Sequence, residues 1–168
     1  MQKRILLLTG SSGVGKTTVL IKTVNALKAK GVNVGGMISR EAREGNARVG
    51  FEIIDLTNGK HGWLAHANQK IGLQVGKYHV NLEDLENIGA TAIEEAVEKC
   101  DVIVIDEIGP MELFLQKFKQ TVKQALASGK LVLAVVHARA EHPLINETKQ
   151  RDDMEIFTVS VANRNTKV

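Results

Sequence analysis

The chain has 168 residues, a length that predicts about one domain and allows a sizeable hydrophobic core. Hydrophobic residues make up 43% of it, charged residues 24%, and the net charge is only +3, as is typical of an ordinary water-soluble globular protein. No block of Lys or Arg indicates a nucleic-acid-binding arm, and no stretch approaches the roughly 18 apolar residues that a membrane span needs.

The N-terminal part of the chain shows a strand, a helix and a second strand. The apolar run Ile5–Thr9 predicts a strand buried on both faces, and it is too short for the apolar region of a signal peptide. Residues 16–30 have helical apolar spacing and stop at Gly31, which predicts a helix with a glycine at its end. A further strand is expected over 32–38.

The middle of the chain departs from simple strand–helix alternation. Residues 48–56 alternate apolar and polar, and the Asn58-Gly59 dipeptide then predicts a hairpin with a return strand through 63–64. Asn81 is placed to cap a helix over 82–99, whose apolar residues again recur at helical spacing.

The second half returns to alternating strands and helices. We expect strands over 102–105, 131–136 and 155–160, and helices over 111–128 and 143–151. The single cysteine, Cys100, excludes an intrachain disulfide and favours a buried structural thiol. The pattern predicts an α/β protein with a mainly parallel sheet, helices on both faces and an inserted β-hairpin, all in one domain over 1–168.

A phosphate-binding loop is the clearest functional motif. The run from Gly10 to Thr17 matches G-x-x-x-x-G-K-[ST] between a buried strand and a helix, which is the context that the motif requires. Its glycines let backbone N–H groups point at phosphate oxygens, and the helix dipole favours the same anion. Lys16 is predicted to bind the β- and γ-phosphates and Thr17 to ligate Mg²⁺. The residues expected to contact the nucleotide are Gly10, Ser11, Ser12, Gly13, Val14, Gly15, Lys16, Thr17 and Thr18.

Two carboxylates follow the strand at 102–105. Asp106 follows the strand at the position where proteins with a phosphate-binding loop hold Mg²⁺. We predict that Asp106 helps to hold Mg²⁺ here. Glu107 is predicted to be the base that activates the attacking water, because the chain turns at a strand end and both side chains can face one crevice. Asp106 to Gly109 also fits the D-x-x-G of regulatory GTPases. The N-K-x-D guanine reader of those proteins is missing, so a guanine-selective switch is not expected.

Other polar residues fall near the expected carboxyl ends of the strands. His137 follows the strand at 131–136 and is predicted to sense the γ-phosphate or the attacking water, although a histidine bonded to a neighbouring loop is the alternative. Arg139, Arg151 and Arg164 are candidates for an arginine that neutralises transition-state charge, and Arg164 is preferred. The charged stretch 40–44 is expected to be a loop, either a lid over the site or an ordinary solvated loop.

The P-loop Gly13-Val-Gly-Lys-Thr-Thr18, combined with Asp106-Glu-Ile-Gly-Pro-Met-Glu-Leu113, resembles a family of small nucleoside triphosphatases. Ser39-Arg-Glu, Arg48-Val-Gly-Phe51 and Asn163-Arg164 extend the resemblance along nearly the whole chain. That family usually has Pro at the position of Ser12 and Gly at that of His79, and we expect the backbone near His79 to differ from it.

The resemblance implies a RecA-like P-loop fold and slow hydrolysis of ATP, GTP, CTP, UTP and TTP to the diphosphate. It also implies nucleotide binding by a second segment, consisting of Val102, Ile103, Val104, Ile105, Asp106, Glu107, Ile108 and Gly109.

The sequence therefore predicts a Mg²⁺-dependent nucleoside-triphosphatase with Lys16, Glu107, His137 and Arg164 as catalytic residues and Thr17 and Asp106 as metal ligands. Nucleoside triphosphates are its expected partners. We expect a cytoplasmic monomer that binds neither membrane nor nucleic acid. A small-molecule or nucleoside kinase and a nucleotide-dependent regulatory module are the alternatives.

Overall fold

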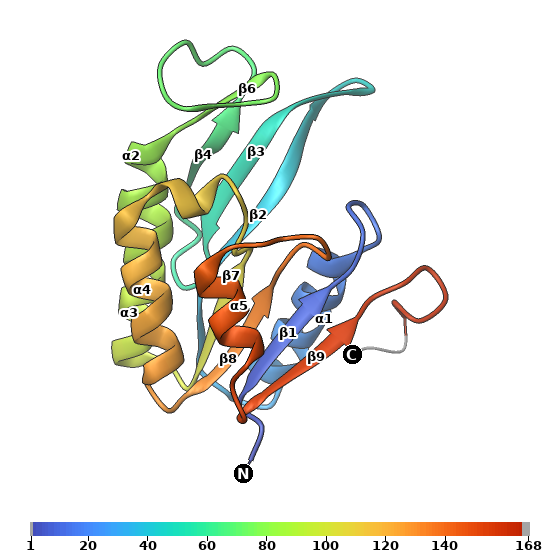
Figure 1. Cartoon of the computed structure of the whole chain (residues 1–168), viewed down its shortest axis with the longest axis vertical. Helices are drawn as coiled ribbons and strands as arrows, with labels where there is room; N and C mark the ends of the chain where they lie inside the picture. The colour runs from blue at the N-terminus through green and yellow to red at the C-terminus, as the bar shows by residue number, and fades with distance from the viewer. Residues whose placement is uncertain (1, 166–168) are drawn as a thin grey trace.

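The computed structural model describes residues 2–165, which form one sheet with helices packed on both sides (Figure 1). The outermost ends of the predicted domain, at 1 and 166–168, lie outside the described residues. The strands are β1 Ile5–Thr9, β2 Val34–Glu44, β3 Ala47–Asp55, β4 His61–His66, β5 Gln74–Val75, β6 Tyr78–Val80, β7 Val102–Asp106, β8 Leu131–Val135 and β9 Met154–Thr158. The helical segments are α1 Lys16–Ala29, α2 Leu82–Asp84, the π-helical η1 Leu85–Ala90, α3 Thr91–Lys99, the 3-10 turn η2 Glu112–Phe114, α4 Gln116–Ala127 and α5 Pro143–Lys149.

The strand order is β5-β6-β4-β3-β2-β7-β8-β1-β9 in the described part of the chain. The strands β2, β7, β8, β1 and β9 are parallel neighbours, and the remaining pairs are antiparallel. The predicted α/β fold and the predicted hairpin of β3 and β4 are both confirmed. Because parallel strands all end at one edge, the ends of β1, β7 and β8 lie close together there.

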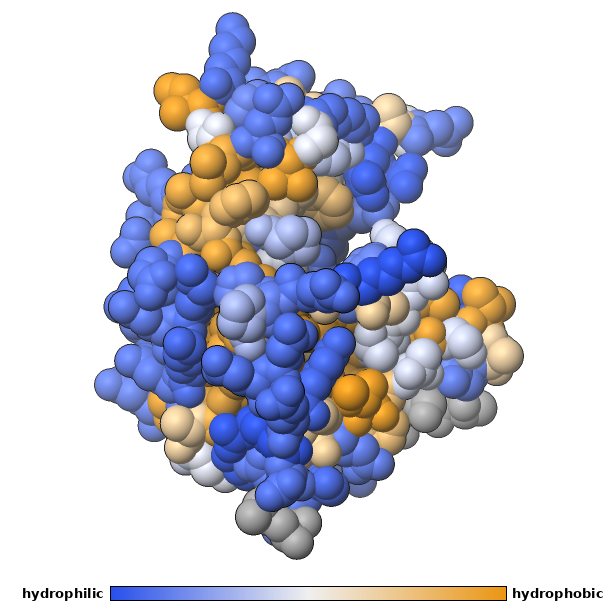
Figure 2. Space-filling model, viewed as in Figure 1, coloured by the Kyte–Doolittle hydropathy of each residue, from blue (hydrophilic) through white to orange (hydrophobic). Residues whose placement is uncertain are grey.

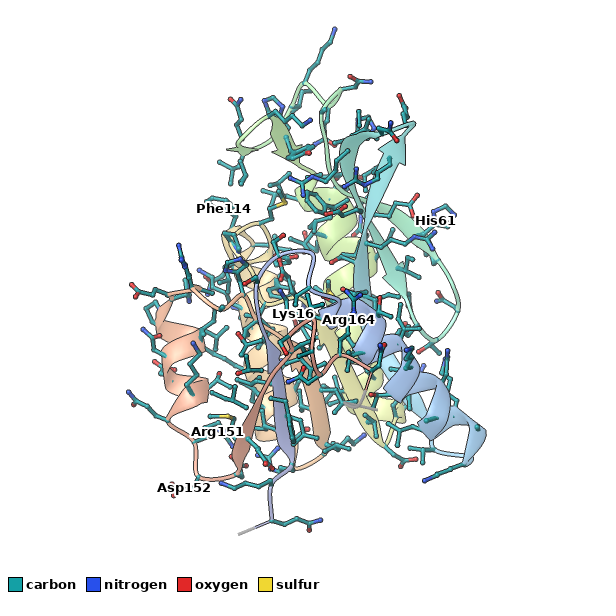
Figure 3. All side chains as sticks on the ribbon, turned by 90° about the vertical axis from the view of Figure 1, so that its right-hand side faces the viewer. Lys16, His61, Phe114, Arg151, Asp152 and Arg164 are labelled. Atoms are coloured by element: carbon teal, nitrogen blue, oxygen red, sulfur yellow. The ribbon has the colours of Figure 1, made fainter. Side chains whose placement is uncertain are left out.

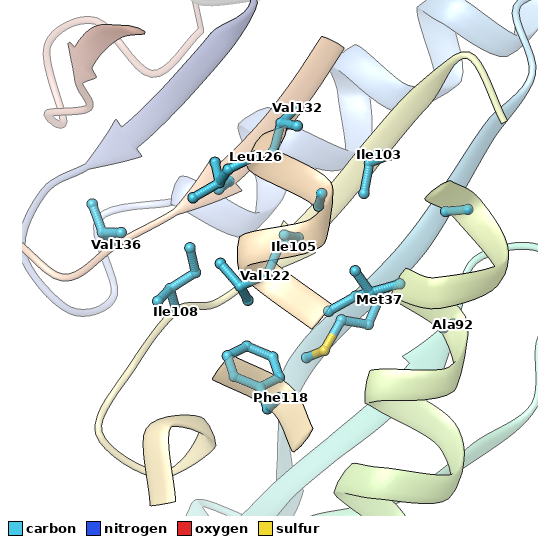
Figure 4. Packing of buried hydrophobic residues seen from close by; sticks show 14 of the residues in the cluster. Met37, Ala92, Ile103, Ile105, Ile108, Phe118, Val122, Leu126, Val132 and Val136 are labelled. Carbon is cyan, nitrogen blue, oxygen red and sulfur yellow. The ribbon is translucent and has the colours of Figure 1, made fainter. Parts of the chain in front are cut away.

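Each face of the parallel strands carries its own apolar core. On one face, Leu20 and Val24 of α1 pack over β7 and β8. On the other, α3, α4 and α5 cover alternate residues of the same strands, and Phe118 is fully buried there (Figures 1 and 4). Complete burial of a side chain such as Phe118 stabilises the fold by about 1.5–3 kcal/mol. Strands covered on both faces explain the continuous apolar runs in the sequence.

The prediction of a charged loop over 40–44 is wrong, because β2 continues through these residues to Glu44. They pair with β3 in an antiparallel hairpin that turns near Gly45, whose φ is 61°. The charged side chains are accommodated because they face solvent or pair across strands, as Arg40 does with Glu52 at 2.8 Å. The stretch is thus part of the sheet rather than a loop.

The expected helix over 111–128 begins only at Gln116, and this prediction is also wrong at its start. Residues 112–114 form a 3-10 turn, and Leu115 is extended with φ −89° and ψ 118°. The side chains of Glu112 and Leu113 are buried beneath this turn. Their inward packing requires a backbone path that a regular helix does not provide.

Two further local features were not specified by the sequence pattern. Within the helical stretch over 82–99, residues 85–90 form a π-helix. Gly89 of this segment packs closely on β3, and a Cβ at Gly89 would lie 2.6 Å from Cδ1 of Ile53. His79 lies in the short strand β6, and its Nδ1 is buried without a hydrogen-bond partner among the described residues. None of the described helices is long and apolar enough to cross a membrane.

Candidate functional site

The loop between β1 and α1 has the backbone shape of a phosphate-binding loop. Gly10, Gly13 and Gly15 have φ values of 149°, 75° and 108°, in the region that favours glycine. A Cβ on Gly10 would also lie only 2.6 Å from the carbonyl oxygen of Val159. The helix α1 begins directly afterwards at Lys16. Its unpaired N–H groups, and with them the positive end of its dipole, therefore face the loop.

Lys16 is held inside this loop by the loop's own carbonyl groups. Its Nζ donates to the carbonyl oxygens of Gly10 at 2.7 Å and Ser11 at 2.9 Å, and only 9% of the residue is exposed. Burial lowers the pKa of the Lys16 ammonium, while the nearby carboxylates of Glu107 and Asp106 act in the opposite direction. The cation therefore lies between the loop and the two carboxylates.

Thr17 and Asp106 meet directly, although 89 positions separate them in the chain. The Thr17 hydroxyl donates to Oδ2 of Asp106 at 2.8 Å, and Asp106 is 2% exposed. Burial raises the pKa of Asp106 from 3.8 to about 7, with a further contribution from Glu107, while the Thr17 hydrogen bond and Lys16 oppose the rise. A hydroxyl and a carboxylate beside a phosphate loop are hard oxygen donors that fit Mg²⁺.

Glu107 and His137 lie at the tips of neighbouring strands, β7 and β8. Burial raises the pKa of Glu107, against the opposing effects of Lys16 and His137. Nδ1 of His137 accepts from the backbone N–H of Arg139 at 3.2 Å, so in the neutral ring Nε2 carries the proton. The Asp106–Glu107 peptide bond is cis. Both carboxylates face one pocket, as the sequence predicted for a strand end.

The pocket that these residues share has a volume of about 320 Å³. Besides the P-loop, Asp106, Glu107 and His137, it is lined by the β2–β3 hairpin and by the end of β8, through Ser39, Arg40, Glu41, Phe51 and Val135. Figure 2 shows a notch in the surface between that hairpin and the P-loop. Phe51 was not among the predicted site residues, although it belongs to the motif Arg48-Val-Gly-Phe51. The alternation along 48–56 reveals a strand, but not which edge of the sheet its side chains reach.

Several other predicted site residues do not line this pocket. Val102–Ile105 and Ile108 are buried in and beside β7, the strand that ends in Asp106. Arg164 packs on the P-loop, with its Cδ 3.4 Å from the position of a Cβ on Gly15 (Figure 3). Arg151 pairs with Asp153 at 2.9 Å, before the start of β9 and so away from the edge where the site lies.

A third buried carboxyl group, Glu112, belongs to the same cluster. It is 1% exposed, and burial followed by repulsion from Glu107 raises its pKa well above the usual value. A Cβ on Gly109 would lie 2.8 Å from Glu107 Oε1 and 2.9 Å from Glu112 Oε2, so both carboxyl groups flank this glycine. No role was predicted for Glu112, which fell within the helix expected over 111–128.

The elevated pKa of Asp106 leads to a testable stability prediction. A raised pKa means that the folded state binds the proton more tightly than the unfolded state. The free energy of unfolding should then fall as the pH rises from 3.8 to about 7. The Asp106→Asn variant keeps an acceptor for Thr17 and loses this penalty, so without Mg²⁺ it should melt at a higher temperature than the parent above about pH 7. At about 1.36 kcal/mol for each pKa unit, the gain has an upper limit of about 4 kcal/mol.

Melting curves of the two metal-free proteins between about pH 4 and pH 8 would check this. The difference between them should shrink as the pH falls from about 7 toward 3.8, because the folded state then takes up the proton on Asp106. An equal difference at all pH values would mean that burial of the charge is not its cause.

Comparisons with known proteins agree with this geometry. The family model described as NTPase matches residues 5–168. The chain is 46% identical over 165 residues to "Nucleoside-triphosphatase THEP1" of Thermofilum pendens, covering 98% of the chain and 91% of that protein. It is 49% identical over 157 residues to the protein of that name from Methanosarcina acetivorans, covering 93% and 87%.

Two solved structures have the same fold. The crystal structure of THEP1 from Aquifex aeolicus superimposes with a TM-score of 0.84 at 32% identity, covering 96% of this chain and 92% of the other. The solution structure of a human cancer-related nucleoside triphosphatase gives 0.82 at 36% identity, covering 97% and 92%. The predicted P-loop fold of the family resemblance is thereby confirmed.

Proposed function

The chain belongs to the NTPase family and is a nucleoside-triphosphate phosphohydrolase, and we propose that it is a Mg²⁺-dependent enzyme of broad substrate range. The proposed substrates are ATP, GTP, CTP, UTP and TTP, which it converts to the diphosphate and phosphate. We propose further that it acts as a cytoplasmic monomer, without membrane or nucleic-acid partners.

The observation that carries this proposal is the contact of Thr17 with Asp106, beside Lys16 and Glu107, in one pocket. Thr17 and Asp106 would hold the metal ion, which neutralises charge on the β- and γ-phosphates when bound. Lys16 would leave the carbonyl groups that now hold it and bind the same phosphates. Its burial strengthens this interaction, because little water screens it.

Glu107 is the proposed base in the hydrolysis step. It accepts a proton from water as the water oxygen attacks the γ-phosphorus, and the bond from that phosphorus to the bridging oxygen breaks. His137 at the tip of β8 can donate Nε2–H to the γ-phosphate or to the water. Arg164, which packs against the P-loop, is the proposed arginine that offsets developing negative charge.

The proposed breadth of substrates can be tested with a panel of triphosphates. Because the N-K-x-D guanine reader is missing from the sequence, discrimination among bases should depend on stacking and shape. The kcat/KM values for ATP, GTP, CTP, UTP and TTP should lie within about two orders of magnitude, or roughly 3 kcal/mol. Phosphate release is measured for each nucleotide with Mg²⁺ and again with excess EDTA. The first measurement tests the substrate range, and the second tests the dependence on Mg²⁺.

Chelation should abolish release for every nucleotide. A ten-thousand-fold preference for one base would contradict the proposal and favour a dedicated switch or kinase. Turnover that needed an added protein would favour a regulatory module instead.

A further inference from the structure

A second cavity, larger than the nucleotide pocket, lies directly beside it. Its volume is about 680 Å³, and it lies between the η2 segment and the beginning of α5. Glu107 and His137 line both cavities. Figure 3 shows Phe114, which lines the second cavity, on a segment set apart from Lys16 and the P-loop. The two cavities therefore meet at the proposed catalytic base.

Apolar and ionisable side chains share the lining of the second cavity, and besides Glu107 and His137 the ionisable ones are Arg139, Glu141 and His142. Pro110, Leu113, Phe114, Ala140 and Ile145 form the apolar part. Phe114 is 48% exposed, and Figure 2 shows apolar surface over the η2 region. Its volume lies in the range of small-molecule sites, which combine apolar walls with polar groups that orient the ligand. An apolar group of a ligand could pack against these side chains.

The position of this cavity relative to the phosphates suggests what its ligand does. In phosphoryl transfer the attacking oxygen and the leaving oxygen lie on opposite sides of the γ-phosphorus. Lys16 and Thr17 hold the side of the P-loop, where the diphosphate remains. The nucleophile must then come from the side of Glu107 and His137, which is where the second cavity opens. The body of any nucleophile larger than water would lie in this cavity.

We propose that this cavity binds a second substrate, a small molecule with an apolar body and a hydroxyl group, which accepts the γ-phosphoryl group in place of water. The proposal depends on the proposed role of Glu107 as base. Glu107 takes the hydroxyl proton, the hydroxyl oxygen bonds to the γ-phosphorus, and the bond to the bridging oxygen breaks. The products are a phosphate monoester and the nucleoside diphosphate.

Benzyl alcohol is a suitable probe, because it consists of one apolar ring and one hydroxyl group. The protein is incubated with Mg²⁺ and ATP labelled with ³²P at the γ-phosphate, with benzyl alcohol or methanol at equal concentration. Benzyl phosphate should form at least about ten times faster than methyl phosphate, because the cavity concentrates the apolar alcohol beside Glu107. Toluene, which has the ring without the hydroxyl, should inhibit the formation of benzyl phosphate.

A pair of variants tests the location of the site. Ala140 lines the cavity, whereas its neighbour Ala138 is exposed and does not. Ala140→Trp should lower the ratio of benzyl phosphate to inorganic phosphate at least ten-fold, and Ala138→Trp should leave that ratio unchanged. If Ala140→Trp does not fold, Phe114→Ser removes an exposed apolar side chain of the cavity and should lower the same ratio.

The outcomes separate this proposal from the proposed function. Absence of phosphate release from ATP without any alcohol would overturn the proposed triphosphatase itself. Normal phosphate release with benzyl phosphate no faster than methyl phosphate would overturn only the second-substrate site. Fast formation of benzyl phosphate that is equal in the Ala140 and Ala138 variants would show that the acceptor binds outside this cavity, and would likewise overturn it.

Discussion

Replacing Glu107 with Gln should lower turnover by roughly 10²–10⁴-fold, which is the usual contribution of general base catalysis. The amide keeps the size of the side chain and its place between the two cavities, but it cannot take a proton. Binding of Mg²⁺ and triphosphate should stay close to normal, because those contacts come from Lys16, Thr17 and Asp106. The loss should therefore appear equally in kcat and in kcat/KM.

The neighbouring variant Asp106→Asn is the matched control, since the two carboxylates are adjacent and face the same pocket. This variant should be slow and should also need more Mg²⁺ for half-maximal rate. Steady-state kinetics of both variants at several Mg²⁺ concentrations would separate the two roles. A raised KM with unchanged kcat in Glu107→Gln would make Glu107 a binding residue. The base would then be sought first at His137, which lines the same pocket.

The Lys16→Ala variant should lose turnover and bind triphosphate more weakly. Loss of one charge-assisted contact costs roughly 1.5–3 kcal/mol, which corresponds to about 10- to 150-fold in affinity. The buried location of Lys16, between the P-loop and two carboxylates, favours the upper part of that range. Titration with ATP and with AMP would check the location of the lost contact, because the effect should be much smaller for AMP.

Lys22→Ala is a suitable control for this experiment, because Lys22 is an exposed lysine of the same helix, α1. It should bind ATP and hydrolyse it like the parent protein. Circular dichroism would confirm that both variants fold. Unchanged activity in a folded Lys16→Ala protein would remove the P-loop from the mechanism.

Features that depend on neighbouring residues could be read from the sequence. The P-loop is such a feature, because its glycine positions and the following helix are all specified within Gly10–Thr17. The buried strands were equally clear, since cover on both faces requires continuous apolar runs. Because the strands were predicted to be parallel, Asp106 and His137 were expected at the same edge of the sheet.

Only the tertiary structure decided the features that depend on distant partners. The stretch 40–44 has the composition of a loop, yet it is a strand because β3 lies beside it and satisfies its backbone groups. The segment before α4 has a helical apolar pattern, yet it leaves the helix so that Glu112 can be buried beside Gly109 and Glu107.

The surroundings of the site were decided in the same way. Which arginine lies near the P-loop follows from the path of the chain around β9, and the second cavity follows from how η2 and α5 pack. Local spacing determines which residue types can perform the chemistry. Strand pairing and helix packing between remote segments determine which of them meet, because those contacts leave no periodic pattern in the sequence itself.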